Sequence, residues 1–466
     1  MTHVHLIGIG GSGLSAIARL LIERGYSVSG SDQELSPLAQ EVQALGAKVS
    51  LGHRQEQVLG ADLVIRSSAI SDANVEVRAA LDAGIPVYKR SEYLGKLTED
   101  STVIAVAGTH GKTTTTAMIS WMLTYLDQDP SYIIGGVSNN LGNNAHAGQG
   151  SLFVIEADEY DRMFLGLHPE IAIVTNVEHD HPDCFPTADN FFQAFVAFVE
   201  GLPENGLLLV CGDDPGAVKL LDFAKANHVK SFSYGLNESG ESIPPDYSSR
   251  NLAMDPQGNY YFEAYFKGTR LAQVALGVPG LHNAQNALAA FTVAHHLNMP
   301  IAKTVQALKE YSGTGRRFEV RSEVSGIAVI DDYAHHPTEI QATLAAARNR
   351  YPDRQIWAVW QPHTYSRTLT LQEEYLTVFN EADHVLVTEV YASREPFNAD
   401  YSAIQVVQAM EHRDARFLAS NSQVTDFLVT NLQSGDVLIV LSAGDAIQIS
   451  QDVVDSLSRN GNAEDV

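Results

Sequence analysis

The sequence predicts an α/β protein with three domains in series: an N-terminal Rossmann-like domain, a central P-loop ATPase-like domain on a mixed sheet, and a C-terminal Rossmann-like domain. Short apolar segments alternate with Ala- and Leu-rich helical stretches along almost the whole chain, which is typical of parallel strands joined by crossover helices. The 466 residues also exceed what one hydrophobic core organises. We expect the domains to span residues 1–99, 100–312 and 313–466.

An acidic composition restricts the possible partners. The chain has 30 Lys and Arg against 56 Asp and Glu, a formal net charge of −26, so we expect it to repel nucleic acids. No apolar run reaches the roughly 20 residues of a membrane span. The N-terminal segment leads directly into a strand and a glycine turn, unlike a signal peptide. The two cysteines do not indicate a disulfide scaffold. We therefore predict a cytoplasmic enzyme without a membrane partner, and we expect it to be a monomer or a homodimer.

The first domain is predicted to open with a buried strand over residues 3–9, a glycine turn and a helix over about 13–24. YSVSG, DLVIRSS and IPVYK are its further strands. The turn matches a dinucleotide fingerprint, which favours NAD or FAD, but the same turn at a helix N-terminus binds any diphosphate, including that of a nucleotide-sugar. The candidate diphosphate-binding residues are Gly10, Gly11, Ser12, Gly13, Asp32, Ser67 and Ser68.

A phosphate loop opens the second domain, where the apolar strand STVIAVAG enters a glycine turn and a Thr-rich helix. Its backbone N–H groups and helix N-terminus suit phosphate oxygens, and the ammonium of Lys112 neutralises the terminal phosphates. The hydroxyl of Thr113 suits Mg²⁺. Val106 stands where the longer form of the loop has glycine, so the loop is the compact kind. It comprises Gly108, Thr109, His110, Gly111, Lys112 and Thr113, followed by Thr114, and predicts binding and hydrolysis of ATP.

Candidate metal ligands follow two further strands of this domain. Glu156 ends LFVIEA, which we expect beside the phosphate-loop strand, and His181 follows IAIVTN in a run of His and Asp. Ligands of open α/β sheets lie at such strand ends. Mg²⁺ prefers oxygen ligands and tolerates an imidazole when phosphates supply the rest, so we expect Thr113, Glu156 and His181 to hold it. Zinc or a metal pair is the alternative that the residues leave open.

The later part of the chain contains an antiparallel segment and three polar runs. Residues 236–275 are rich in turns and are predicted to be antiparallel, and the helix HNAQNALAAFTVAHHL follows. The third domain is expected to contain the strands IAVIDDY, QIWAVWQ, HVLVTEV and DVLIVLS. Its polar runs are GRRFE at the domain junction, DDYAHHP after one strand and QPHTYSR after another. Arginines in such runs suit carboxylates or phosphates, which their planar forks of donors match.

Eight motifs in one order resemble those of the Mur ligase family: GIGGSGLSAIA, GTHGKTTT, EADEYD, NVEHDHPD, HNAQNALAA, GRRFE, DDYAHHPTE and QPHTYSR. The resemblance covers about residues 4 to 445 and is strongest to the branch that adds L-alanine to UDP-N-acetylmuramate, the first amino-acid addition to the peptidoglycan precursor. It implies that ATP phosphorylates the lactyl carboxylate of the sugar. The resulting acyl phosphate is attacked by the amine, which leaves an amide, ADP and phosphate.

The resemblance also implies roles for individual residues. Lys112 contacts the ATP phosphates, Thr113 and Glu156 hold one Mg²⁺, and His181 belongs to a second. Asn283 and Asn286 contact adenine. In the third domain, Arg317 contacts the phosphates and Asp332 contacts the ribose. The acyl phosphate and the amino-acid carboxylate are bound by His336, His363 and Arg367. The glycine turn, Asp32, Ser67 and Ser68 bind the UDP portion.

Departures from the family pattern keep alternatives open. Many relatives have Arg where this chain has Thr364, and Tyr160 replaces a common Ser and is shared with ligases that recycle murein tripeptide. No lysine occurs between Lys112 and Lys219, so a carbamylated lysine has no candidate just after His181. The recycling ligase is therefore the nearest alternative. An NAD-dependent oxidoreductase and a nucleotide-binding regulator without catalysis are alternatives from other classes.

Overall fold

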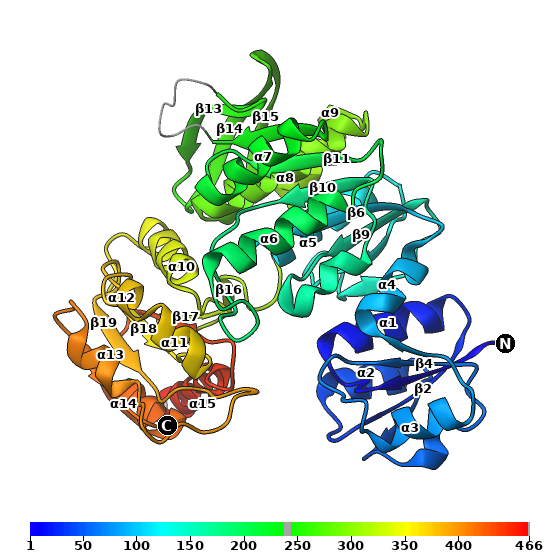
Figure 1. The fold of residues 1–466 in the computed structure, drawn as a ribbon. Helices are drawn as coiled ribbons and strands as arrows, with labels where there is room; N and C mark the ends of the chain where they lie inside the picture. The colour runs from blue at the N-terminus through cyan, green and yellow to red at the C-terminus, as the bar shows by residue number, and fades with distance from the viewer. Residues whose placement is uncertain (237–243, 465–466) are drawn as a thin grey trace.

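Three sheets, each with its own helices, make up the computed structural model, which describes residues 1–236 and 244–464. In Figure 1 the N-terminal sheet, the central sheet and the C-terminal sheet form three lobes, with the central one adjoining the other two. The predicted α/β class is confirmed. In the part of the chain that is described, no helix is long and apolar enough to cross a membrane.

The N-terminal sheet is entirely parallel, in the order β3-β2-β1-β4-β5. Its first strand and helix agree with the predicted ones to within two residues, whereas β3, at the edge of the sheet, was not predicted. Its elements are β1 (His3–Ile7), α1 (Ser12–Glu23), β2 (Ser27–Asp32), α2 (Pro37–Ala44), β3 (Lys48–Leu51), η1 (Gln55–Val58), β4 (Leu63–Arg66), α3 (Val75–Asp82), β5 (Val87–Lys89) and α4 (Arg90–Thr98).

The central sheet is mixed, in the order β15-β14-β13-β12-β11-β10-β6-β9-β7-β8. β6 lies between β9 and β10 and is parallel to both, so the predicted pairing of the phosphate-loop strand with LFVIEA is confirmed. Its first elements are β6 (Thr102–Ala107), α5 (Lys112–Tyr125), β7 (Ser131–Ile133), β8 (Ala145–His146), β9 (Leu152–Glu156), η2 (Tyr160–Gly166), β10 (Ile171–Val174) and α6 (Ala188–Glu200).

The far half of this sheet contains the predicted antiparallel segment, because β13, β14 and β15 pair antiparallel; residues 237–243 of the predicted range lie outside the described residues. The helix α8 begins at Leu281, one residue before the predicted helix start at His282. The remaining elements are β11 (Leu207–Cys211), α7 (Pro215–Ala226), β12 (Lys230–Gly235), β13 (Tyr247–Met254), β14 (Asn259–Phe266), β15 (Thr269–Pro279), α8 (Leu281–His296) and α9 (Ile301–Glu310).

The C-terminal sheet has the order β16-β17-β21-β18-β19-β20, and only β16 is antiparallel to its neighbour. The four strands predicted here are present, and the edge strands β16 and β20 were not predicted. Its elements are β16 (Glu319–Val324), β17 (Ile327–Asp332), α10 (Pro337–Arg350), β18 (Ile356–Trp360), α11 (Tyr365–Thr370), α12 (Gln372–Tyr375), β19 (His384–Val387), α13 (Ile404–Ala409), β20 (Ala415–Phe417), α14 (Asn421–Asn431), β21 (Val437–Leu441) and α15 (Ile447–Glu464).

The N-terminal sheet is attached to the central sheet through α4 and α1. A side chain on Gly166 of η2 would meet the backbone oxygen of Ser91 in α4 at 2.0 Å, so glycine is required for this close approach. Arg24, after α1, donates to the carbonyl of Leu97 at 2.9 Å. Buried residues of both sheets belong to one hydrophobic cluster. The N-terminal and central domains therefore share a packed boundary.

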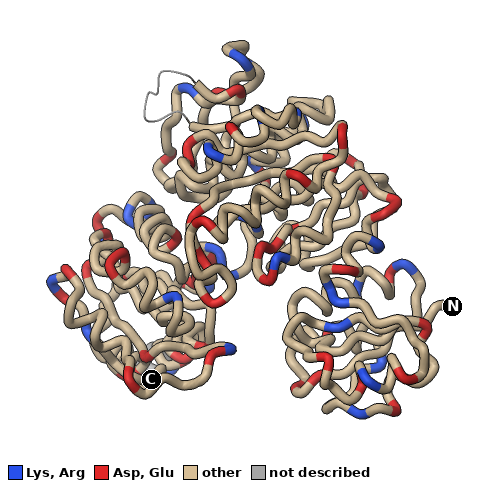
Figure 2. Tube along the Cα trace, viewed as in Figure 1, with Lys and Arg blue, Asp and Glu red and all other residues tan. Residues whose placement is uncertain are grey.

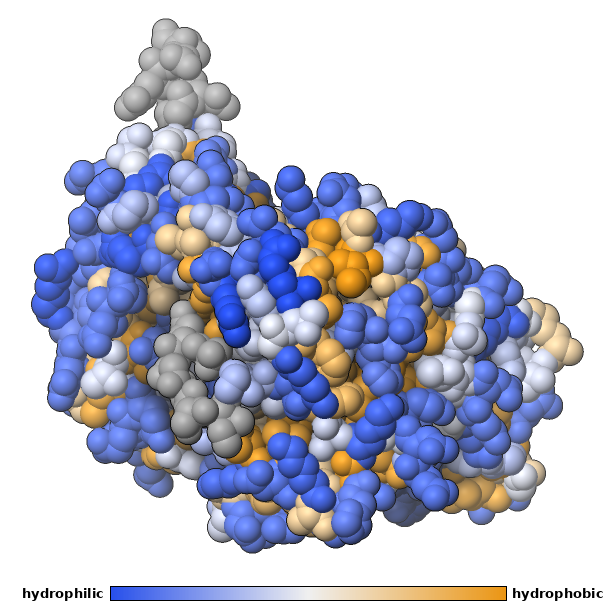
Figure 3. Space-filling view, turned by 90° about the horizontal axis from the view of Figure 1, so that it is seen from above, coloured by the Kyte–Doolittle hydropathy of each residue, from blue (hydrophilic) through white to orange (hydrophobic). Residues whose placement is uncertain are grey.

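Charge is distributed over all three lobes, with Asp and Glu positions throughout (Figure 2). The face seen in Figure 3 is mostly hydrophilic, with hydrophobic residues scattered between polar ones. The large apolar side chains are instead buried in the cores on either side of each sheet. A binding site is therefore expected among the polar residues at the carboxyl ends of the strands, where the lobes meet.

Candidate active site where the three domains meet

The phosphate loop follows β6 and turns into α5 at Gly111. Gly111 has φ +78°, the left-handed region that glycine adopts at little cost. Gly108 has φ +132°, and a side chain there would lie 2.0 Å from the hydroxyl oxygen of Thr175, just after β10. The glycine spacing of the motif therefore has a local structural cause. It leaves the N–H groups at the start of α5 available for phosphate oxygens.

Lys112 is held by its own loop and by a buried carboxylate. Its Nζ donates to the carbonyls of Gly108 at 2.6 Å and Thr109 at 3.1 Å and forms an ion pair with Glu159 at 2.9 Å. Burial alone would lower the pKa of Lys112, but Glu159, together with Asp158, raises it. Lys112 is therefore a cation, and it lies at the loop where phosphates would bind. Glu159 was not predicted, although it lies within EADEYD.

The three predicted magnesium ligands line one cavity of about 370 Å³. Glu156 accepts from the backbone N–H of Gly135 at 2.8 Å, and Thr113 hydrogen-bonds its carboxylate. His181 instead contacts Glu159 at 3.5 Å. A hydroxyl, a carboxylate and an imidazole around a space that phosphates can enter suit Mg²⁺, which leaves part of its shell to water and phosphate. The residues therefore fit the ion.

A second cavity, of about 560 Å³, lies on the other side of the loop. Asn283 and Asn286, at the buried start of α8, line it, and a side chain on Gly111 would lie 2.7 Å from Asn286 Oδ1. Arg317 lines both cavities. Asp332 lines this one and accepts from the N–H groups of Phe318 and Ala334, each at 2.7 Å. Burial raises the pKa of Asp332 to about 6. The predicted adenosine and phosphate contacts are thus brought together.

The third domain closes the smaller cavity with a buried ion pair. Arg367 Nε donates to Asp180 Oδ1 at 2.7 Å and Nη2 to Oδ2 at 3.2 Å, and both side chains are at most 5% exposed. His363 lines the same cavity, and burial, with the nearby cation Arg367, lowers its pKa to about 3. His363 is therefore neutral. The ion pair joins QPHTYSR to the run after β10, as expected for one site.

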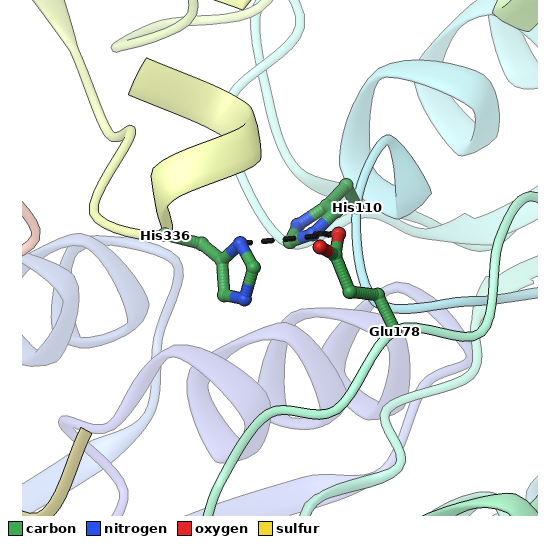
Figure 4. A group of neighbouring side chains, drawn as sticks. All are labelled: His110, Glu178 and His336. Carbon is green, nitrogen blue, oxygen red and sulfur yellow. Dashed lines mark hydrogen bonds and ion pairs between the residues drawn. The ribbon is translucent and has the colours of Figure 1, made fainter. Parts of the chain in front are cut away.

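The adjacent histidines of DDYAHHP lie in different surroundings. His335 lines the smaller cavity with His363 and Arg367. His336, predicted for the acyl phosphate, is instead the N-cap of α10 and lies beside His110 and Glu178 (Figure 4). It is absent from the described lining of both cavities. The structure therefore places His335, rather than His336, among the predicted acceptor-side residues.

His110, Glu178 and His336 form a cluster with the spacing of a metal site, within 4.8 Å of one another. His110 Nε2 lies 2.9 Å from Glu178, and its Nδ1 lies 3.3 Å from Glu339 of α10. Burial alone would lower the pKa of His110, but these two carboxylates raise it to about 9. A protonated His110 thus already bridges them, which favours an ionic contact between the phosphate loop and α10 over a metal ion.

This contact predicts a pH-dependent stability. Because the pKa of His110 is raised from 6.5 to about 9, its contribution is complete below pH 6.5 and is lost as the pH rises through 9. We expect His110→Asn to lower the melting temperature by a few degrees at pH 7 and by much less at pH 10. Thermal unfolding of both proteins at the two pH values measures this. The exposed His228→Asn is the control, and an equal difference at both pH values would contradict the bridge.

The predicted UDP-binding residues gather at the carboxyl edge of the N-terminal sheet. Gly10 N–H donates to Asp32 Oδ2 at 2.8 Å, and a side chain on Gly8 would lie 3.1 Å from Ser67 Cβ. Ser12 and Gly13 line the smaller cavity, whereas Gly10, Gly11, Asp32, Ser67 and Ser68 lie outside its described lining. The glycine turn therefore opens toward the phosphate loop.

Arg90, which was not predicted, lies over this turn. It follows β5, lines the smaller cavity, and its Nη1 would lie 1.7 Å from a side chain on Gly13. Glycine at position 13 makes room for the guanidinium. A basic residue at the end of a short strand was the available signal, because strand ends of this sheet form the binding edge. Arg90 therefore places a cation beside the predicted diphosphate-binding turn.

Comparisons with known proteins agree with this arrangement. Family models match residues 3–102 (Mur ligase family, catalytic domain), 106–294 (Mur ligase middle domain) and 316–444 (Mur ligase, glutamate ligase domain). A UDP-N-acetylmuramate–L-alanine ligase of Caldanaerobacter subterraneus is 38% identical, with 96% of each chain covered. The chain belongs to the Mur ligase family. The same-named enzyme of a Roseiflexus species is 40% identical over 98% of this chain and 99% of the relative.

Solved structures of Mur ligases share the three-domain fold. The crystal structure of a UDP-N-acetylmuramate–alanine ligase from Thermotoga maritima has a TM-score of 0.82 and 26% identity, and covers 99% of this chain and 100% of its own. A murein peptide ligase from Psychrobacter arcticus has a TM-score of 0.70 and 27% identity, covering 98% and 99%. Membership of the Mur ligase family accounts for the phosphate loop and the third domain, which an NAD-dependent oxidoreductase leaves unexplained.

Proposed function

We propose that this Mur ligase joins L-alanine to UDP-N-acetylmuramate at the expense of ATP, in the synthesis of the peptidoglycan precursor. The observation that carries the proposal is the smaller cavity, lined by residues of all three domains. Ser12 and Gly13 approach it from the glycine turn, Lys112 from the phosphate loop and Arg367 from the third domain. Full-length relatives with 38 to 40% identity bear the corresponding name.

Charge neutralisation is the main contribution of the phosphate-loop side. The substrate carboxylate and the ATP phosphates are anions, and bringing them together requires local cations in a protein of net charge −26. Lys112 and Arg317 line the cavity and supply these local cations. Thr113, Glu156 and His181 would hold Mg²⁺, and the bound ion would supply further positive charge for neutralising the phosphates. Phosphorylation converts the carboxylate oxygen into a leaving group, so no protein nucleophile is needed.

The acceptor side orients the amine. Burial lowers the pKa values of His335 and His363, so both rings are neutral at pH 7 and can accept a hydrogen bond from the attacking amine. Arg367 and Asp180 hold the third domain against the central domain next to these rings. Positioning the amine within about 3–3.5 Å of the activated carbonyl is the remaining requirement.

Amino-acid-dependent release of phosphate from ATP tests the proposal. With UDP-N-acetylmuramate and Mg²⁺, we expect release to require L-alanine and to stay at background with the tripeptide L-alanyl-γ-D-glutamyl-meso-diaminopimelate. Release with the tripeptide alone would make the chain a recycling ligase. Tyr160, shared with that branch, makes the comparison informative, since its ring lies 5.1 Å from His181 beside the acceptor side of the cavity.

A further inference from the structure

The N–H donors of Arg367 already have hydrogen-bond partners within the protein. The family resemblance, in contrast, assigns the Arg367 side chain to the amino-acid carboxylate. Nε and Nη2 donate to the two oxygens of Asp180, and Nη1 donates to the carbonyl of His363 at 3.2 Å. The side chain is 3% exposed. A substrate carboxylate would have to displace Asp180 and leave it buried without its arginine partner, which is strongly unfavourable. Another cation is needed on the acceptor side.

Arg394 is such a cation. It lies in the segment between β19 and α13 and lines the same cavity as His335, His363 and Arg367. Its Nε donates to Asp183 Oδ2 at 2.9 Å, and its Nη2 lies 2.8 Å from the same oxygen in an ion pair. Within the described residues no hydrogen bond engages its Nη1, and the side chain is 40% exposed. Arg394 thus keeps donors that a second carboxylate can accept.

The position of Arg394 is fixed by its neighbours in the chain. Glu395 accepts from the backbone N–H groups of Tyr365, at 2.6 Å, and Ser366, at 3.1 Å, at the start of α11. Tyr391 N–H donates to the carbonyl of Pro362 at 2.8 Å. These bonds join the segment of Arg394 to the segment that carries His363 and Arg367. The loop that carries Arg394 is therefore fixed relative to His363 and Arg367, as the position of a binding group requires.

The guanidinium of Arg394 also packs on the ring of Tyr160. Its Cζ lies 4.2 Å from the centre of the Tyr160 ring, and the Tyr160 hydroxyl donates to Asp183 at 3.1 Å. Arg394 and Asp183 form an ion pair, in which Nη2 lies 2.8 Å from Oδ2. The Tyr160 ring and the Asp183 carboxylate leave the Nη1 edge of the planar guanidinium available to another partner.

We propose that Arg394 binds the α-carboxylate of the incoming amino acid through its Nη1 and Nη2 groups. This inference rests on the proposed function and names the group that selects an amino acid by its carboxylate. Asp183 and Tyr160 keep the guanidinium in place while it does so. The amine then lies toward His335 and His363, on the side of the cavity where the activated carbonyl forms.

Steady-state kinetics of Arg394→Gln test the site. We expect the KM for L-alanine to rise by about 10- to 100-fold, as for loss of a charge-assisted pair of hydrogen bonds, with the KM for ATP and for UDP-N-acetylmuramate within about twofold. Arg394→Lys should recover part of the affinity. Arg413→Gln, which removes an exposed arginine of the same domain, should leave all three constants unchanged. A change confined to the ATP constant would overturn the proposal.

L-alaninamide separates carboxylate binding from a structural role, because it carries the same amine without the carboxylate. The unmodified enzyme should prefer L-alanine in kcat/KM by at least about tenfold, and Arg394→Gln should reduce that preference toward one. Equal losses with both acceptors would overturn the proposal. Absence of amino-acid-dependent phosphate release in the unmodified enzyme would instead refute the proposed function.

Discussion

Replacing Lys112 by Ala is expected to reduce phosphate release by at least about 1000-fold while changing UDP-N-acetylmuramate affinity by less than about threefold. The ammonium lies at the phosphate loop, where developing charge must be neutralised, and such electrostatic contributions are among the largest in catalysis. The UDP portion is assigned to the glycine turn of another domain. Phosphate release and calorimetric binding of the UDP-sugar measure the two effects separately.

Glu159 complicates this substitution, because it is fully buried and would lose its ion-pair partner. Breaking a buried pair costs about 3–5 kcal/mol, so Lys112→Ala should also unfold at a lower temperature. In Lys112→Ala/Glu159→Gln the unpaired charge is removed. We expect that variant to regain stability and to stay inactive. Lys219→Ala, at an exposed position of α7, is the control. Recovery of activity together with stability would contradict a role for Lys112 at the phosphates.

Arg367→Met is expected to lower kcat by at least about 100-fold without a selective change in the KM for any one substrate. The substitution leaves Asp180 buried and unpaired between the domains, at a cost of about 3–5 kcal/mol. The third domain then dissociates from the central domain more readily, and all acceptor-side groups move with it. Kinetics and the radius of gyration from solution scattering are the measurements, and we expect the radius to increase.

A double substitution distinguishes this docking role from direct substrate binding. In Arg367→Met/Asp180→Asn no unpaired charge remains, so the compact radius should be largely restored. Arg416→Met, in an exposed ion pair with Asp414, is the control and should change neither quantity. A rise confined to the KM for L-alanine in Arg367→Met would instead make Arg367 the carboxylate ligand and remove the need for Arg394.

The sequence predicted those parts of the molecule that depend on local patterns. Buried strands such as β6 and β10 have uninterrupted apolar runs, and the glycines around Lys112 report backbone conformations that few other residues adopt. The edge strands β3, β16 and β20 were missed because they are short or mostly exposed, which leaves no clear alternation to read.

Side-chain pairings between distant segments could not be predicted in the same way. Arg367 and Asp180 are 187 positions apart, and their contact depends on how two domains pack. The motif DDYAHHP does not reveal which histidine faces the cavity, since α10 begins at Pro337, with His336 as its N-cap, and the chain changes direction there. Arg90, Glu159 and Arg394 lie at strand ends or in loops, where residue type alone does not indicate a partner.

Transfer of oxygen from the substrate carboxylate to phosphate tests the central claim most directly. UDP-N-acetylmuramate labelled with ¹⁸O in both lactyl carboxylate oxygens would be converted with ATP, Mg²⁺ and L-alanine, and the released phosphate analysed by mass spectrometry. Attack of the carboxylate on the terminal phosphorus, followed by expulsion of phosphate by the amine, predicts one ¹⁸O in every phosphate and one in the amide. Phosphate without ¹⁸O would show that water, rather than the carboxylate, accepts the phosphoryl group, and would contradict the proposed ligase mechanism.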